Sequence, residues 1–415
     1  MNFKFASLKG KVVFKKTILG LLGVAIAAGA LTGCEKLSES LKTKATDSQS
    51  YPSSAKIKVT TTELTGKFVI NPQFAEAKSF REGLAAVKVG DEKTGKWGFI
   101  DTKGNLAIPP QFDFADSFDE GLARVGIGQL PNMKWGYVDK SGKMKIIPQF
   151  SRAGSYSDGL AMVSADKTFP SKYGYMNADG NLVINQEFAN PSNFSEGLAA
   201  VSYSYTQGAN FGYVDKKGVV TIKPQFGFAG DFKEGLARVA IGSFNKGKWG
   251  YINSQGEMLI NPLYEGAGDF SEGLACVLLG EGANIRWGFI NSKGEMVIEP
   301  KYLGEIFDGR SYPHKFSEGL AAVKFGENKK DDWGYIDKKG QVAIAPRYQY
   351  AGRFSNGLGR VLVATESGLL WGYIDNSSQM VIPPYFLTAE DFSDGLALVY
   401  VPLVGGSRKY GYIGR

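Results

Sequence analysis

The sequence predicts an all-β fold, a tandem array of about nine three-stranded antiparallel units that are 38 residues long. Two landmarks, an aromatic-glycine pair and a glycine-leucine pair, recur in one shared register at steps of 38 residues, with a single step of 46 and a last aromatic-glycine step of 39. The composition agrees, because 54 glycines and 13% aromatic residues suit short strands joined by glycine turns. Self-similarity at a fixed period of this length indicates a repeat architecture.

The first two strands of each unit form a predicted hairpin. In residues 96–101 the alternation places Trp97 and Phe99 on one face of a strand. Asp101 and Gly104 predict a turn, because aspartate can bond the turn backbone and glycine accepts a positive φ. The second strand carries an isoleucine in every unit, and a proline closes it in all units but one. These isoleucines are Ile70, Ile108, Ile146, Ile184, Ile222, Ile260, Ile298, Ile344 and Ile382.

The third strand follows the glycine-leucine pair. Gly121 turns the chain, and Leu122 and Val125 fill the strand in a representative unit. Burial of one indole contributes about 4–6 kcal/mol before entropy, at ~25 cal/mol per Å². One unit therefore does not offset the entropy of its own ordering. Stability has to come from neighbouring units that stack on one another.

These motifs resemble the WG β-repeat (KWG repeat) family of bacterial proteins. The resemblance covers residues 59–415 and rests on aromatic-Gly-Tyr/Phe-Ile, Asp-x-x-Gly, Ile-x-Pro-x-aromatic and Phe-x-Glu-Gly-Leu-Ala-x-Val. The first unit departs from the pattern with Val59 and Thr60 in place of Trp-Gly, and Ser378 replaces one turn glycine. The resemblance implies an architecture and no defined activity.

The two ends of the array favour a propeller-like ring. The first unit has a degenerate first strand, and an extra strand at residues 410–413 ends the chain. This offset lets the last strand complete the first unit. The alternative is an open β-superhelix (a solenoid) whose atypical ends are caps.

The N-terminal segment predicts export and lipid anchoring. A basic start precedes an apolar stretch of 14 residues, 17–30, which is too short to span a bilayer. It leads into Leu31-Thr32-Gly33-Cys34, which resembles a bacterial lipobox. We expect a lipoprotein signal peptide over residues 1–33, a flexible tether over 34–56 that starts at lipidated Cys34, and the repeat domain over 57–415. The alternatives are an ordinary signal peptide or a short membrane anchor.

Charge and residue usage argue against several function classes. Without the leader the chain has 43 basic and 41 acidic residues, which does not predict nucleic-acid binding. His314 is the only histidine, and no zinc, phosphate-loop, EF-hand or nucleophile motif is present, so we expect no metal, no cofactor and no catalytic residue. Cys276 is the one cysteine of the repeat domain, and its place in a strand predicts a small semi-buried residue.

The acidic residues and the tryptophans follow the repeat. Glu82, Glu120 and their equivalents precede the turn glycine in most units, which predicts a structural role rather than a catalytic one. The tryptophan stripe could stack carbohydrate, but its strand register predicts core.

Function on a repeat scaffold is expected where repetition fails. The clearest break is the eight-residue lengthening within residues 303–315, which holds Phe307, Arg310, Tyr312 and His314, and we take it as a candidate binding loop. The alternative is a neutral surface insertion. A second candidate is the tyrosine-rich segment 203–205.

The sequence thus predicts a non-enzymatic protein of the bacterial cell envelope. Its lipid anchor would hold it on the outer side of the cytoplasmic membrane or on the outer membrane, and its scaffold would bind a protein or glycan partner. Two alternatives are a carbohydrate-active enzyme that uses carboxylates on one face of the array, and a purely structural envelope component.

Overall fold

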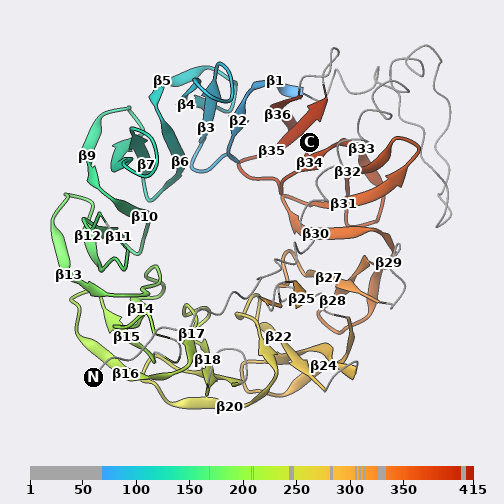
Figure 1. Ribbon diagram of the computed structural model, residues 1–415. Helices are drawn as coiled ribbons and strands as arrows, with labels where there is room; N and C mark the ends of the chain where they lie inside the picture. Colours follow the sequence, from blue (N-terminus) through green and yellow to red (C-terminus); the bar gives the residue numbers. More distant parts are fainter. Residues whose placement is uncertain are drawn as a thin grey trace, which may run out of the picture.

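The computed structural model describes residues 68–167, 169–206, 208, 210–242, 247–280, 284–303, 306–307, 310–311, 315–325, 333–402 and 408–415. Its regular elements in these residues are β-strands, and no α-helix occurs among them. Nine small antiparallel sheets stand in a ring around a central axis (Figure 1). The fold is therefore a nine-bladed β-propeller, and the predicted all-β repeat array is confirmed.

The strands are grouped here by blade, in chain order. Blade 1 holds β2 (Glu76–Ala77), β3 (Leu84–Val89), β4 (Lys96–Asp101) and β5 (Leu106–Phe112); blade 2 holds β6 (Phe114–Asp119), β7 (Leu122–Ile127), β8 (Lys134–Asp139) and β9 (Met144–Phe150); blade 3 holds β10 (Arg152–Ser157), β11 (Leu160–Ser164), β12 (Tyr173–Asn177) and β13 (Leu182–Phe188). Blade 4 holds β14 (Leu198–Val201), β15 (Phe211–Asp215) and β16 (Val220–Phe226); blade 5 holds β17 (Phe228–Ala229), β18 (Ala237–Ile241), β19 (Lys248–Ile252) and β20 (Met258–Tyr264); blade 6 holds β21 (Gly266–Ala267), β22 (Leu274–Leu279), β23 (Arg286–Asn291) and β24 (Met296–Tyr302).

The last three blades complete the ring. Blade 7 holds β27 (Leu320–Lys324), β28 (Trp333–Asp337) and β29 (Val342–Tyr348); blade 8 holds β30 (Tyr350–Ser355), β31 (Leu358–Thr365), β32 (Gly368–Ile374) and β33 (Met380–Phe386); blade 9 holds β34 (Thr388–Ala389), β35 (Leu396–Pro402), β36 (Arg408–Gly414) and β1 (Phe68–Phe74). A separate two-stranded ladder pairs β25 (Ile306–Phe307) with β26 (Arg310–Ser311).

In the residues that the structure describes, seven blades contain a fourth, inner strand that the sequence pattern does not predict. In blades 1, 5, 6 and 9 this strand is only two residues long. Its sequence is rich in alanine and glycine, with no alternation of apolar and polar residues, so a pattern based on period two misses it. The inner strands are the strands nearest the central axis in Figure 1.

The ring closes through the two ends of the array. β1 pairs with β36 in antiparallel register, with Phe68 opposite Ile413 and Phe74 opposite Tyr410. The earliest described strand thus becomes the outer strand of the last blade, which confirms the propeller-like ring over the open superhelix. Tyr412 Oη also donates a hydrogen bond to the Lys78 carbonyl across the closure, at 2.7 Å.

The core lies between blades, as the stacking argument requires. One buried cluster joins Trp97, Phe99 and Ile108 of blade 1 to Phe118 and Val125 of blade 2. The glycine after each tryptophan has a packing reason, because a Cβ on Gly98 would lie 2.5 Å from the Ile108 carbonyl oxygen. A blade therefore buries its apolar side chains mainly against its neighbour.

A ring of side-chain hydrogen bonds reinforces these interfaces. In every blade the residue before the turn glycine has a φ of 51–55°. Its side chain accepts a hydrogen bond, at 2.7–3.2 Å, from the backbone N–H of the equivalent turn glycine in the next blade. We call this contact the inter-blade latch. The acceptors are Glu82, Glu120, Asp158, Glu196, Glu234, Glu272, Glu318, Asn356 and Asp394. Their periodic position thus has a structural cause.

Candidate functional site

The two faces of the propeller differ in sequence regularity. Because successive strands run antiparallel, the latch turns and the Asp-x-x-Gly turns lie on one face, the turn face. The Lys140–Glu82 ion pair at 3.0 Å joins the two kinds of turn across blades. The segment that leads into the aromatic-glycine strand of each blade lies on the opposite face, the loop face, and these segments vary most between repeats.

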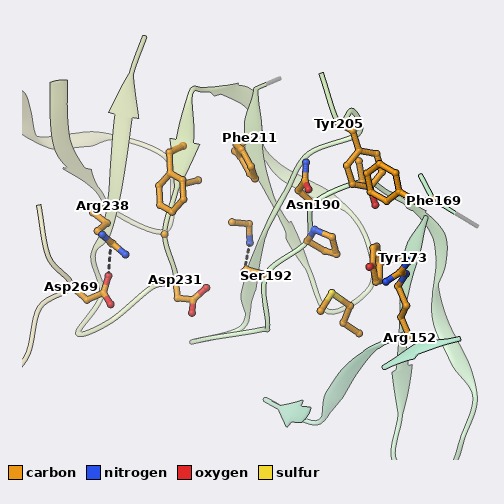
Figure 2. Close-up of a pocket in the computed structure, with 17 residues that line it drawn as sticks. Arg152, Phe169, Tyr173, Asn190, Ser192, Tyr205, Phe211, Asp231, Arg238 and Asp269 are labelled. Atoms are coloured by element: carbon orange, nitrogen blue, oxygen red, sulfur yellow. Dashed lines mark hydrogen bonds and ion pairs between the residues drawn. The ribbon is translucent and has the colours of Figure 1, made fainter. Parts of the chain in front are cut away.

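A cavity of about 460 Å³ opens where two loop-face segments replace the regular pattern. Figure 2 shows its lining, which comes from blades 3 to 6. Phe169 comes from the segment between β11 and β12, and Tyr205 comes from the segment between β14 and β15. Among the described residues blade 4 has no inner strand, and Asn190 and Ser192 line the cavity from that part of the chain. This volume falls within the range of small-molecule and side-chain binding pockets.

Aromatic rings form one wall of the cavity. The Phe169 and Tyr205 rings lie 5.0 Å apart in a tilted arrangement, and the Phe169 side chain is 71% exposed. Tyr205 Oη donates a hydrogen bond to the Ser171 carbonyl, which ties the two segments together. Burial raises the pKa of Tyr205, so its hydroxyl stays a donor near neutral pH. The Phe211 and Phe228 rings continue the wall, 6.0 Å apart.

Polar groups complete the cavity. Arg152 donates from Nε to Ser171 Oγ at 2.9 Å, and Asn190 donates from Nδ2 to the Ser204 carbonyl at 3.1 Å. Arg238 forms an ion pair with Asp269 at 2.8 Å, drawn as a dashed line in Figure 2. Asp231 also lines the cavity, and its carboxylate has no hydrogen bond or ion pair with the described residues.

The structure bears on some of the residues singled out by sequence. Cys34 lies outside the described residues, as do Tyr312 and His314. Phe307 and Arg310 lie opposite each other in the backbone register of the short β25–β26 ladder. The role of this loop in binding stays a prediction. Tyr205, from the second candidate segment, lines the cavity. Arg152, Asn190 and Asp231 were missed, because nothing marks them in the sequence until the blades are placed side by side.

Other expectations are borne out by burial. The predicted core position of the tryptophans holds for Trp97, Trp249, Trp287 and Trp333, which are at most 8% exposed. Cys276 is buried, as its place in a strand predicts, and this burial raises the pKa of its thiol. Among the described residues no group of three or more histidine, cysteine, aspartate or glutamate side chains could hold a metal ion. No helix in this part of the chain is long and apolar enough to cross a membrane.

A closed ring of nine blades, with irregular segments on its loop face, defines a β-propeller scaffold that carries a cavity on that face. The chain matches the family described as WG containing repeat over residues 64–92, 97–130, 135–168, 173–204, 211–246, 249–281, 287–302, 333–363 and 371–401. These segments make up more than half of the sequence, and the chain belongs to this family.

One solved structure shares the fold at low sequence identity. One described as a eukaryotic initiation factor is 14% identical with a TM-score of 0.54, and the match covers 80% of this chain and 94% of that one. The β-propeller domain of the Trilobed protease from Pyrococcus furiosus is 10% identical with a TM-score of 0.36, over 61% of this chain and 91% of that one. A comparison with curated proteins finds no match. The similarity to the first of these two structures concerns architecture alone.

Proposed function

We propose that this protein is a non-enzymatic, lipid-anchored scaffold of the bacterial cell envelope that binds a protein partner at its loop-face cavity. The cavity with its unpaired Asp231 is the observation that carries this proposal. It combines an apolar aromatic wall with a few convergent polar groups, which is the usual composition of binding sites. The cavity also lies where the loop-face segments depart from the repeat pattern, so its side chains are not part of the packing that every blade shares.

The use of the acidic residues supports a role in binding rather than catalysis. The repeated acids accept hydrogen bonds from the neighbouring blade in the inter-blade latches. In the cavity, Asp269 is held by Arg238 at 2.8 Å and by Lys315 at 3.1 Å. A glycosidase needs two carboxyl groups that are free to act on the substrate. Asp231 has no second free carboxyl group beside it among the described residues that line the cavity, which favours binding over the carbohydrate-active alternative.

The anchor belongs to the same proposal. Acylated Cys34 would hold the propeller at the membrane through the tether at residues 34–56, on the outer side of the cytoplasmic membrane or on the outer membrane. Metabolic labelling with an alkyne fatty acid tests this step. We expect the wild-type protein to carry the label in the membrane fraction and Cys34→Ser to lose both. Retention of the label by Cys34→Ser would contradict the anchor.

A site-specific cross-linking experiment tests the binding cavity. A photo-reactive residue is placed at Phe169, at the edge of the cavity, and a matched one at Leu106, which is 56% exposed on the outer strand of blade 1. We expect irradiation of living cells to give a discrete cross-linked product from position 169 and none from 106. Tyr205→Ala should reduce that product. Equal products from both positions would show that the cavity is not the binding site.

A further inference from the structure

The nine blades place equivalent residues at every interface, so the cavity can be compared with its counterparts. Two positions matter at each interface. The first position is the second residue after the glycine-leucine pair. The second position lies in the following blade, directly before the phenylalanine or tyrosine of its inner segment. Blade 5 has Arg238 at the first position and blade 6 has Asp269 at the second. Blades 8 and 9 supply Arg360 and Asp391 in the same way.

These two interfaces hold their arginines with the same contacts. Arg238 and Arg360 each place Nε 2.8 Å from a carboxylate oxygen of the aspartate. Nη1 of each donates to a backbone carbonyl of the next blade, Ala267 at 2.9 Å and Ala389 at 2.6 Å. The guanidinium carbon of Arg238 lies 5.6 Å from the Trp249 ring centroid, and that of Arg360 lies 5.1 Å from the Trp371 ring centroid. Carboxylate, carbonyl and ring thus form one arginine seat.

The interface between blades 4 and 5 has the seat without its arginine. Asp231 occupies the aspartate position, Ala229 the carbonyl position, and Phe211 the ring position. The position that should carry the arginine holds Ala200. All four residues line the cavity, so the cavity includes the place that an arginine fills at the two interfaces with the complete seat.

This combination occurs once around the ring. The other blades without an arginine carry alanine, methionine, cysteine or leucine at the first position, and the following blade presents serine, asparagine, lysine or arginine at the second. Only Ala200 faces an aspartate. The two cations among the described residues that line the cavity do not compensate for the missing arginine. Arg238 is neutralised by Asp269, and Arg152 lies at the far end of the cavity from Arg238 in Figure 2.

We propose that the cavity between blades 4 and 5 binds the guanidinium group of an arginine side chain from the protein partner. The inference rests on the proposed function, and it names the chemical group that this site selects. Asp231 would receive the guanidinium in the geometry that Asp269 and Asp391 use. The Ala229 carbonyl would accept a second hydrogen bond, and the Phe211 ring would cover the cation. Phe169 and Tyr205 would contact the rest of the partner segment at the rim.

The test uses the full-length protein and three small probes: N-acetyl-arginine amide, N-acetyl-lysine amide and N-acetyl-citrulline amide. Citrulline keeps the shape of arginine and removes its charge. We expect calorimetric or NMR titration to show saturable binding of the arginine probe, with the citrulline probe at least about tenfold weaker. Equal binding of the arginine and citrulline probes, tighter binding of the lysine probe, or no saturation by the arginine probe at about 10 mM would overturn the inference.

Three variants sharpen the test. Ala200→Arg supplies the missing arginine from the chain itself, so it should abolish binding of the probe while keeping or raising the thermal midpoint. Asp231→Asn keeps the shape of the side chain and removes its charge, so it should weaken binding by about tenfold or more. Asp179→Asn removes the same charge from an exposed turn-face position and should leave binding unchanged. Binding that survives in both Ala200→Arg and Asp231→Asn would overturn the assignment of the seat.

The two proposals fail in different ways. If Ala200→Arg abolishes the cross-link from position 169 and the arginine probe does not bind, the cavity still binds the partner, but its specificity for guanidinium is wrong. If the arginine probe binds and the cross-link persists in Ala200→Arg, the seat exists, but the partner docks elsewhere. Loss of both on filling the seat supports the two proposals together.

Discussion

The inter-blade latch gives a single side chain a measurable effect on stability. Glu120 holds a positive φ of 53° and accepts a hydrogen bond from the Gly159 N–H at 2.7 Å. Glu120→Ala keeps the strained backbone and removes the acceptor, so we expect a loss of about 1 kcal/mol in the free energy of unfolding. Glu120→Asn should cost less than about 0.5 kcal/mol, because Asn356 makes the same contact in the native ring.

Chemical denaturation measures both variants. Glu299→Gln is the matched control, since it changes an exposed glutamate on an outer strand that forms no latch. A Glu120→Ala protein as stable as this control would show that the latch does not contribute to the interface.

The latches also predict a pH dependence of stability. Burial raises the pKa of Glu82, but hydrogen bonds from Lys140 and the Gly121 N–H outweigh this effect, so the pKa lies below its ordinary value of 4.5. The Lys338 ammonium and the Gly319 N–H lower the pKa of Glu272 in the same manner. A depressed folded-state pKa contributes stability that is present above the unfolded pKa and is lost as the pH falls through the folded pKa.

We therefore expect a constant denaturation midpoint from pH 7 to about pH 5 and a decrease below about pH 4.5. Lys140→Met should remove part of the acid-dependent decrease and lower stability slightly at pH 7. An unchanged slope below pH 4.5 in Lys140→Met would mean that other carboxylates dominate.

At the scale of one strand, the tyrosine after the aromatic-glycine pair ties a blade to its neighbour. Tyr213 is fully buried and donates from its hydroxyl to the Gly230 carbonyl in the next blade, at 2.7 Å. Tyr213→Phe leaves this buried carbonyl without its partner, so we expect a loss of about 1–2 kcal/mol in the free energy of unfolding. Phe99 and Phe289 occupy the same position natively, so the fold itself should survive.

Equilibrium unfolding followed by tryptophan fluorescence tests this expectation. Tyr203→Phe is the control, because Tyr203 is 39% exposed and its hydroxyl has no hydrogen bond to the described residues. Equal stability of the two variants would show that the Tyr213 hydroxyl does not contribute to the free energy of unfolding.

The strand pattern also explains what could be read from the sequence. Trp97, Ile108 and Gly104 follow a strict register, so strands, hairpins and stacking units were predictable from periodicity. The inner strand escaped because segments such as Gly266–Ala267 are too short and too small to show a pattern. Ala200 and Asp231 look ordinary in their own repeats. Their mismatch gains meaning only when the ring places blade 4 against blade 5.

At the scale of the whole molecule, stability depends on closing the ring. β1 completes blade 9, and Ile70 and Phe74 share a buried cluster with Tyr412 and Phe80. A chain that starts at Ala75 loses this strand and leaves the edge of β36 unpaired. We expect its thermal midpoint to fall by roughly 10 °C or more, with concentration-dependent association through the open edge, in differential scanning calorimetry and light scattering.

A circular permutant separates the loss of the strand from the position of the chain ends. Phe68 lies opposite Ile413, so a short linker can join residue 415 to residue 68 without crossing the ring. New ends are placed between Glu366 and Ser367, in the exposed turn from β31 to β32. Because this permutant keeps every blade and every latch, we expect its thermal midpoint to lie within about 5 °C of the 68–415 chain. A permutant as unstable as the chain that starts at Ala75 would mean that chain order, and not the β1–β36 ladder, determines the stability of the closed ring.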